Sequence, residues 1–219
     1  MTSLKGVERR FRAEARRWDE IYSDAGSPWA RAWDRWTRDN VRRRFARTFE
    51  LAGDLTGRSV LDVGCGSGRY LVEALSRGAG RVVGIDLAAE MVETARALVA
   101  GRSGADKGGN RVELWTGDLM AYEPGARFDL VIANGLFDYL DAPAQALTRI
   151  HAWTAGLLVA TFPDRRALRA LPRTLYWRTK GVRIRLYDEG SIRALASAAG
   201  LGAVEIERIG PIYLLAARA

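Results

Sequence analysis

The stretch Val60-Leu61-Asp62-Val63-Gly64-Cys65-Gly66-Ser67-Gly68 decides the fold class of this chain. It is a short apolar strand that carries an acid and then opens into three glycines at alternate positions. Glycines let a backbone turn tightly and approach a ligand closely, because no Cβ stands in the way. A second apolar strand, Arg81–Ile85, ends at Asp86, where a carboxylate can accept hydrogen bonds from a ribose. Together the two stretches predict a nucleoside-binding crevice.

Strands and helices alternate on both sides of this stretch. Repeated strand–helix units imply a parallel sheet with right-handed crossovers. The strands are nearly continuous apolar runs, as expected when helices cover both faces of the sheet. We expect strands at Ser59–Asp62, Arg81–Ile85, Val112–Thr116, Phe128–Ala133 and Gly156–Thr161, and helices at about 67–78, 88–100, 142–153 and 189–199.

The two ends of the chain add further elements. Two more strands, Ala203–Ile209 and Ile212–Ala217, flank Gly210-Pro211 and predict a β-hairpin at one edge of the sheet. Residues 4–22 carry apolar side chains at helical spacing, and a second helix is expected from near Pro28 to about Ala52. We therefore expect a helical cap or lid at 1–53 and an α/β domain at 54–219, which includes a basic, aromatic insert at 163–188.

Composition limits the class of protein. A length of 219 residues suits one α/β domain with a modest extension, and the single cysteine excludes an intrachain disulfide. We see no secretory signal and no apolar run that could span a membrane, so we expect a soluble cytoplasmic protein. The net charge of +8 is concentrated in residues 1–50 and 163–185. These stretches are either solvated helix faces or surfaces that attract an anionic partner.

The spacing of the glycine loop separates two classes of cofactor. A dinucleotide site needs the pattern G-x-G-x-x-G, but here the third glycine, Gly68, comes one place early and Arg69 occupies the expected position. Asp62 stands two residues before the first glycine, where a carboxylate would repel a pyrophosphate. The same carboxylate suits a ligand that bears an ammonium and a sulfonium. The loop therefore favours S-adenosylmethionine over NAD, and an NAD oxidoreductase is the remote alternative.

With these motifs the chain resembles the class I S-adenosylmethionine-dependent methyltransferases. The resemblance implies a Rossmann-like sheet of seven mostly parallel strands with a C-terminal antiparallel hairpin, helices on both faces, and S-adenosylhomocysteine as the product. The motifs that carry it are Val60–Gly68, Val83-Gly84-Ile85-Asp86 with Glu90-Met91, Trp115-Thr116-Gly117-Asp118-Leu119, and Phe128-Asp129-Leu130-Val131-Ile132.

The resemblance also implies roles for individual residues. Asp86 would bind the ribose hydroxyls, Asp118 would contact the adenine amino group, and Leu87, Met91 and Leu119 would lie near the adenine, next to Gly117. The residues that would surround the methionine part of the cofactor are Asp62, Gly64, Cys65, Gly66, Ser67, Gly68, Asn134 and Gly135.

A narrower likeness concerns the acceptor side. Trp18–Tyr22, Asn134–Tyr139, Ala160–Pro163 and Ile212–Leu215 look like segments of the magnesium-protoporphyrin O-methyltransferases. That subgroup uses a tyrosine at the position of Tyr22 and a histidine where this chain has Asp138. We therefore expect Asp138 to be the catalytic base, with Tyr22 and Tyr139 as its hydrogen-bonding partners. The alternative for Asp138 is a cap on the following turn.

Four further residues are candidates for contact with the acceptor. Trp18 lies in the first predicted helix, and Trp177, Arg183 and Arg185 lie in the basic insert. The two arginines alternate with apolar residues, so they would share one face of an extended segment and meet an acidic or aromatic substrate. The alternative is ordinary packing of aromatic and basic side chains on the sheet.

Two other functions remain open beside a small-molecule methyltransferase that acts on oxygen. The basic insert is compatible with RNA or another polyanion as acceptor. However, the fourth strand is followed by Asn134–Phe137 and not by Asn/Asp-Pro-Pro-Tyr, which methylation of exocyclic amines of DNA bases and much RNA-base methylation need. A protein that binds the cofactor without turnover would keep the same cofactor residues. No group of residues has metal-ligand spacing, so no metal is expected.

Overall fold

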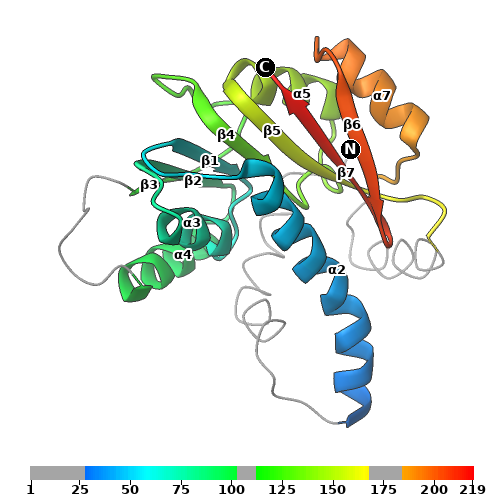
Figure 1. The fold of residues 1–219 in the computed structure, drawn as a ribbon, viewed down its shortest axis with the longest axis horizontal. Helices are drawn as coiled ribbons and strands as arrows, with labels where there is room; N and C mark the ends of the chain where they lie inside the picture. Colours follow the sequence, from blue (N-terminus) through cyan, green and yellow to red (C-terminus); the bar gives the residue numbers. More distant parts are fainter. Residues whose placement is uncertain (1–27, 103–111, 168–183) are drawn as a thin grey trace.

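The computed structural model describes the backbone of residues 28–102, 112–167 and 184–219, and the side chains of residues 40–101, 112–167 and 184–219. Its centre is one seven-stranded sheet in the order β3-β2-β1-β4-β5-β7-β6 (Figure 1). All neighbouring strands are parallel except β7, which runs antiparallel to both β5 and β6. The strands are β1 (Ser59–Val63), β2 (Arg81–Asp86), β3 (Val112–Thr116), β4 (Phe128–Ala133), β5 (Thr154–Pro163), β6 (Val204–Ile209) and β7 (Ile212–Arg218).

Helices cover both faces of this sheet. On one face, buried side chains of α5 (Pro143–Ala152) and α7 (Glu189–Ala198) pack against the strands. On the other face the packing comes from α2 (Pro28–Ala52), α3 (Arg69–Ser76) and α4 (Ala89–Arg102). This arrangement confirms the predicted α/β class and the C-terminal hairpin. In the part of the chain that the structure describes, no helix has both the length and the apolar character of a membrane span.

The alternation of side chains along β1 decides which way its acid points. Leu61 and Val63 belong to the core under α5 and α7, whereas Val60 belongs to the core under α2 and α3. Successive side chains of a strand point to opposite faces. Asp62 therefore shares the face of Val60 and points toward the side on which α2 and α3 lie.

Helix α2 is joined to the sheet through its C-terminal half. Phe49 is fully buried, and its ring lies 5.1 Å from that of Phe45 and 5.8 Å from that of Tyr70 in α3. Arg47 forms an ion pair of 2.7 Å with Glu207 of β6. The N-terminal half of the helix projects away from the sheet (Figure 1). The last turns of the predicted cap are therefore part of the domain core.

The strand predictions differ from the structure mainly at β5. Gly156–Thr161 was expected, but the strand extends from Thr154 to Pro163. Phe128 of β4 pairs with Thr154 at one end, and Ile212 of β7 pairs with Pro163 at the other. The additional residues are held by partners distant in sequence, so local hydrophobicity did not predict them.

Candidate active site

A cavity of about 240 Å³ lies beyond the carboxyl ends of the parallel strands. In the sheet order, β1 lies between β2 and β4, so the chain leaves β1 on one side and returns on the other. Ligands of open α/β sheets bind at such a reversal of strand order. The cavity is lined by Arg44, Val63, Gly64, Cys65, Gly66, Ser67, Arg69, Tyr70, Ile85, Asp86, Leu87, Met91, Gly117, Asp118, Leu119, Asn134, Gly135, Leu136, Asp138, Tyr139 and Leu140.

The glycine loop has a backbone shape that a side chain would disturb. Gly66 has a φ of +51° and Gly68 a φ of +82°, in the left-handed region that other residues rarely adopt. A Cβ on Gly68 would lie 2.8 Å from the Cβ of Ala95, so this glycine lets α3 approach α4 closely. A Cβ on Gly66 would meet no described atom within 4 Å. Gly66 lines the cavity, so we expect this open space to be part of it and free for a ligand.

Asp86 holds this loop from the end of β2. Its Oδ2 accepts a hydrogen bond of 2.9 Å from the backbone N–H of Gly66, and its Oδ1 accepts one of 2.9 Å from the N–H of Ala88. Burial raises the pKa of Asp86, and these backbone donors oppose the rise. A carboxylate oxygen can accept more than one hydrogen bond. Asp86 can therefore hold the loop and still accept bonds from a pair of hydroxyls.

Asp62 is more deeply buried than Asp86, Asp118 and Asp138. Only 2% of its surface is exposed, and its Oδ2 has no hydrogen-bond donor among the described residues. Burial, with the nearby Asp86, raises its pKa to about 8, and the charge of Arg44 opposes the rise. A buried carboxylate without a donor is costly unless a cation or a proton compensates it. Asp62 does not itself line the cavity, but the next two residues, Val63 and Gly64, do. An ammonium bound beside them would stabilise its ionised form.

The third acid stands one strand further from β1. Asp118 follows β3, and its Oδ1 accepts a hydrogen bond of 2.9 Å from the N–H of Met120. Leu119 and Met91 are buried beside it in the cavity wall. Adjacent strands lie about 4.8 Å apart. The three acids therefore follow one another along the edge of the sheet, in the order Asp62, Asp86, Asp118, with apolar side chains at the far end.

On the other side of β1, the end of β4 meets α2. The Nδ2 of Asn134 donates to the Oγ1 of Thr48 at 3.0 Å, and the N–H of Gly135 donates to the Oγ1 of Thr161 in β5 at 2.9 Å. Asn134 is buried, and its Oδ1 has no donor in the described part of the protein. These bonds fix the start of the loop that leads from β4 to α5.

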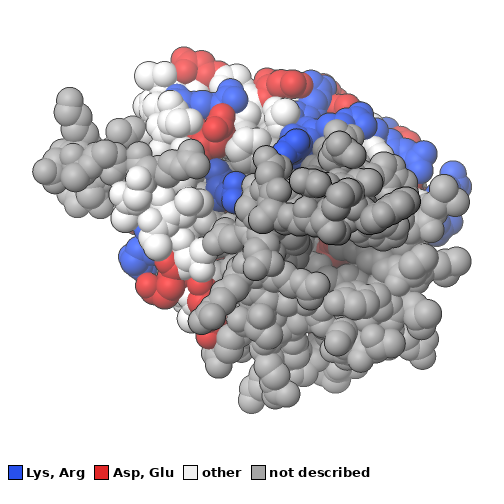
Figure 2. Space-filling view, turned by 90° about the horizontal axis from the view of Figure 1, so that it is seen from below, with Lys and Arg blue, Asp and Glu red and all other residues white. Residues whose placement is uncertain are grey.

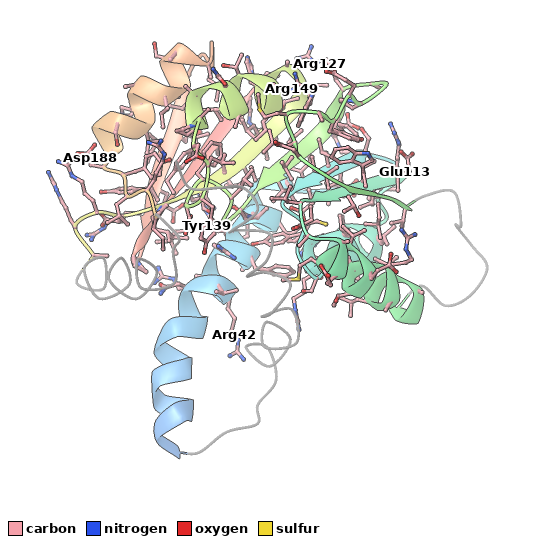
Figure 3. The ribbon with its side chains drawn as sticks, turned by 180° about the vertical axis from the view of Figure 1, so that it is seen from behind. Arg42, Glu113, Arg127, Tyr139, Arg149 and Asp188 are labelled. Carbon is pink, nitrogen blue, oxygen red and sulfur yellow. The ribbon has the colours of Figure 1, made fainter. Side chains whose placement is uncertain are left out.

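Asp138 and Tyr139 lie further along that loop. Asp138 is 6% exposed, and both residues line the cavity with Leu136 and Leu140. The first residue before α5 is Ala142, which makes no side-chain cap, so Asp138 is not the N-cap of that helix. Tyr139 lies at the opposite end of β4 from Arg127 (Figure 3). The structure thus brings the predicted base into the same cavity as the glycine loop.

Several expected residues are not placed at the cavity. Trp18, Tyr22, Trp177 and Arg183 lie outside the described residues. Arg185 is described and does not line the cavity, because its guanidinium donates to the carbonyl oxygens of Leu140 and Asp141. The structure therefore does not place Arg185 in the cavity wall, and its contact with a substrate stays a prediction.

Sequence reasoning missed other residues of the cavity wall. Arg44 comes from α2, where nothing in the sequence tells which helix face meets the sheet. A Cβ on Gly135 would lie 3.2 Å from the Nη1 of Arg44, so a glycine at this position gives the guanidinium of Arg44 room. Arg69 and Tyr70 begin α3 directly after the glycine loop. Their position next to the loop in the sequence could have indicated that they line the cavity.

The surface around this end of the molecule has mixed charge. Seen from below, the described part of the face carries a band of basic side chains with a few acidic ones among them (Figure 2).

The comparisons with known proteins agree with this geometry. A family described as "Methyltransferase domain" matches residues 33–206. The ribosomal protein L11 methyltransferase of Xanthomonas euvesicatoria is 41% identical over 96 residues, which span 44% of this chain and 29% of that protein. The malonyl-[acyl-carrier protein] O-methyltransferase of Halalkalibacterium halodurans is 30% identical over 116 residues, spanning 49% of this chain and 40% of that protein. The chain thus covers less than half the length of these relatives.

Among solved structures, the fold is similar to that of the magnesium protoporphyrin IX methyltransferase of Synechocystis PCC 6803 with bound S-adenosylhomocysteine. The TM-score is 0.74 at 21% identity, and the match covers 98% of each chain.

Proposed function

The chain belongs to the class I S-adenosylmethionine-dependent methyltransferases, and we propose that it methylates an oxygen of a small aromatic or anionic molecule. One observation carries the choice of acceptor. Asp138 is buried and lines the same cavity as the glycine loop, together with Leu136, Tyr139 and Leu140. A part of the wall that combines apolar side chains with the single acid Asp138 suits an aromatic hydroxyl compound.

The arrangement of the three acids supports a single orientation of the cofactor. Asp62 would hold the ammonium, Asp86 the ribose hydroxyls, and Asp118 the adenine amino group near Leu87, Met91 and Leu119. Their order follows the order of β1, β2 and β3 in the sheet. The methionine end would then lie nearest β4, beside Asn134, Gly135 and Asp138.

The chemistry needs little from the protein besides position and a proton acceptor. Bound S-adenosylmethionine supplies an electrophilic methyl group on a sulfonium. The cavity would hold the acceptor oxygen in line with the carbon–sulfur bond, at about 3–3.5 Å. Asp138 would take the proton of an acceptor hydroxyl as the new carbon–oxygen bond forms, with Tyr139 and Tyr22 as hydrogen-bonding partners. An acceptor that is already a carboxylate would need no base.

Turnover against a panel of phenols, carboxylates and amines tests the proposal. We expect formation of S-adenosylhomocysteine with a phenol, and an oxygen-methylated product by mass spectrometry. Asp138→Asn should lower kcat for that phenol by about 100-fold or more, which is the usual contribution of a general base. The matched control is Asp141→Asn, which changes an exposed acid three residues further on and should leave kcat unchanged.

The alternatives give different results. Turnover of amines without any phenol or carboxylate would overturn the choice of oxygen. Methylation of generic RNA, with binding that weakens steeply as salt rises, would favour a polyanionic acceptor. Binding of S-adenosylhomocysteine in calorimetry without turnover of any class would favour a non-catalytic role.

A further inference from the structure

The loop that carries Asp138 is held by two residues from a distant part of the chain. The Nε of Arg185 donates to the carbonyl oxygen of Leu140 at 2.7 Å, and its Nη2 donates to that of Asp141 at 2.6 Å. The backbone N–H of Arg185 donates to the carbonyl oxygen of Asp138 itself at 2.9 Å. The hydroxyl of Tyr187 donates to the carbonyl oxygen of Phe137 at 3.0 Å.

The side chains of Arg185 and Tyr187 are well suited to bind the carbonyl oxygens of this loop. A guanidinium presents several N–H donors in a rigid plane, so one side chain can bond two successive carbonyl oxygens. Tyr187 is 5% exposed, and its ring packs edge-on against Phe162 at 5.2 Å. Phe162 in turn packs on Phe137 at 4.5 Å. The buried rings of Tyr187, Phe162 and Phe137 thus hold one side of the loop, and the exposed Arg185 holds the carbonyl oxygens on the other.

The segment 184–187 is itself fixed to the sheet. Tyr187 donates its N–H to the carbonyl oxygen of Pro163 at 2.8 Å and accepts a bond of 2.8 Å from the N–H of Arg165. Asp164, whose side chain is fully buried, forms an ion pair with Arg208 of β6 at 2.6 Å. The loop is therefore tied through Tyr187 to the end of β5, and not only to its own neighbours in sequence.

We propose that Arg185 and Tyr187 are positioning residues that hold the carboxylate of Asp138 toward the acceptor. This inference rests on the proposed function of Asp138 and adds the groups that orient it. Neither residue touches the reacting atoms. They act by satisfying four carbonyl oxygens of residues 137–141, which leaves the loop one conformation in which Asp138 faces the cavity.

Hydrogen exchange of the full-length protein tests the clamp without any acceptor. In Arg185→Gln and in Tyr187→Phe, we expect faster exchange in peptides that cover residues 136–142, and unchanged exchange in those that cover residues 60–68. Affinity for S-adenosylhomocysteine should change by less than about twofold. Arg193→Gln is the matched control, because Arg193 is an exposed arginine that pairs only with Glu189 among the described residues. Unchanged exchange at 136–142 in both variants would overturn the clamp.

Kinetics test its effect on catalysis, with the phenol of highest turnover in the panel. Arg185→Gln should lower kcat by about 10- to 100-fold, since a misplacement of about 1 Å can cost this much. Arg185→Lys should recover only part of the loss, because one ammonium cannot replace the planar pair of donors. A change in cofactor affinity with no loss of kcat would contradict a positioning role.

A double variant separates this inference from the proposed function. If Arg185 acts through Asp138, adding Arg185→Gln to Asp138→Asn should lower kcat by no more than about twofold further. Fully multiplied effects would overturn the coupling of the two residues. If Asp138→Asn alone leaves kcat unchanged, the assignment of the base fails, whereas the exchange experiment still decides the clamp.

Discussion

The amide of Asn134 donates to the hydroxyl of Thr48 at 3.0 Å, and the two residues are 86 positions apart in the chain. This bond joins the end of β4 to α2 at the wall of the cavity. Thr48 is fully buried and its hydroxyl also donates to the carbonyl oxygen of Arg44 at 2.7 Å. The helix that brings Arg44 to the site is thus attached to the strand that leads to Asp138.

Thr48→Val should destabilise the protein by about 1–3 kcal/mol, because it leaves the buried Nδ2 of Asn134 without its acceptor. The matched control is Thr148→Val in α5, whose exposed hydroxyl likewise donates to the carbonyl four residues earlier. That change should cost no more than about 0.5 kcal/mol. Urea unfolding measures both. Equal losses in the two variants would mean that the bond to Asn134 contributes nothing.

The affinity for S-adenosylhomocysteine should rise with pH through the titration of Asp62. Its pKa in the folded protein, about 8, is above the usual 3.8. At low pH the Asp62 carboxyl is neutral, and the folded protein without ligand has its full stability. That contribution to the free energy of unfolding is lost as the pH rises through the folded pKa and the buried carboxyl must ionise. A ligand ammonium favours the ionised form, so affinity should rise by up to about tenfold per pH unit below the pKa.

Calorimetry from about pH 6 to about pH 8.5 measures this dependence. Asp62→Asn is the control, because it keeps the shape of the side chain and removes the titration. Its affinity should be lower at high pH and nearly constant with pH. A wild-type affinity that does not vary over this range would contradict a titrating Asp62 at the ammonium site.

Asp86→Ala should weaken S-adenosylhomocysteine binding by about 100-fold or more. It removes the acceptor for the ribose hydroxyls and the bond that holds Gly66, and hydrogen bonds to charged groups contribute about 1.5–3 kcal/mol each. Asp129→Asn serves as the control, since Asp129 also accepts from a backbone N–H, that of Ser59 at 2.8 Å, but does not line the cavity. Asp129→Asn should lower the free energy of unfolding and leave the affinity for S-adenosylhomocysteine unchanged. Equal affinities of wild type and Asp86→Ala would refute the ribose assignment.

The glycines of the loop should separate binding from stability. Gly66→Ala adds a methyl group to open space in the cavity, so cofactor affinity should fall strongly while stability falls by about 1–2 kcal/mol from the left-handed backbone. Gly68→Ala adds the same strain and a clash with Ala95, so its loss of stability should be larger. Thermal unfolding and calorimetry give both quantities.

Gly57→Ala is the control for this pair. Gly57 has a φ of +71°, and a Cβ there would meet no described atom within 4 Å. It lies before β1, away from the cavity wall. The variant should lose stability like Gly66→Ala but keep full cofactor affinity. Loss of affinity in both would show that backbone strain, and not the filled space, weakens binding.

The sequence was sufficient for the half of the site that is built from local signals. Gly64–Gly68 follow β1 directly, Asp86 ends β2, and Asp118 follows β3. Parallel strands bring their carboxyl ends to one edge of the sheet, so knowing the strands was enough to bring these residues together. The apolar residues of β3 and β4 are neighbours in sequence, so the strands could be predicted locally. Their predicted bounds are those of the structure.

How distant segments meet at that edge depends on the tertiary structure. Arg44 reaches the cavity because α2 packs through Phe49 on the sheet, and Arg185 turns to the carbonyl oxygens of Leu140 and Asp141 because Tyr187 is bound to the end of β5. A helix or an extended segment shows in its sequence that it has an apolar side, but not which partner that side will meet. Contacts between residues far apart in the chain depend on the whole packed core. The cavity wall that follows β1, β2 and β3 could therefore be predicted from the sequence, whereas the hydrogen bonds of Arg185 and Tyr187 to the loop of Asp138 could not.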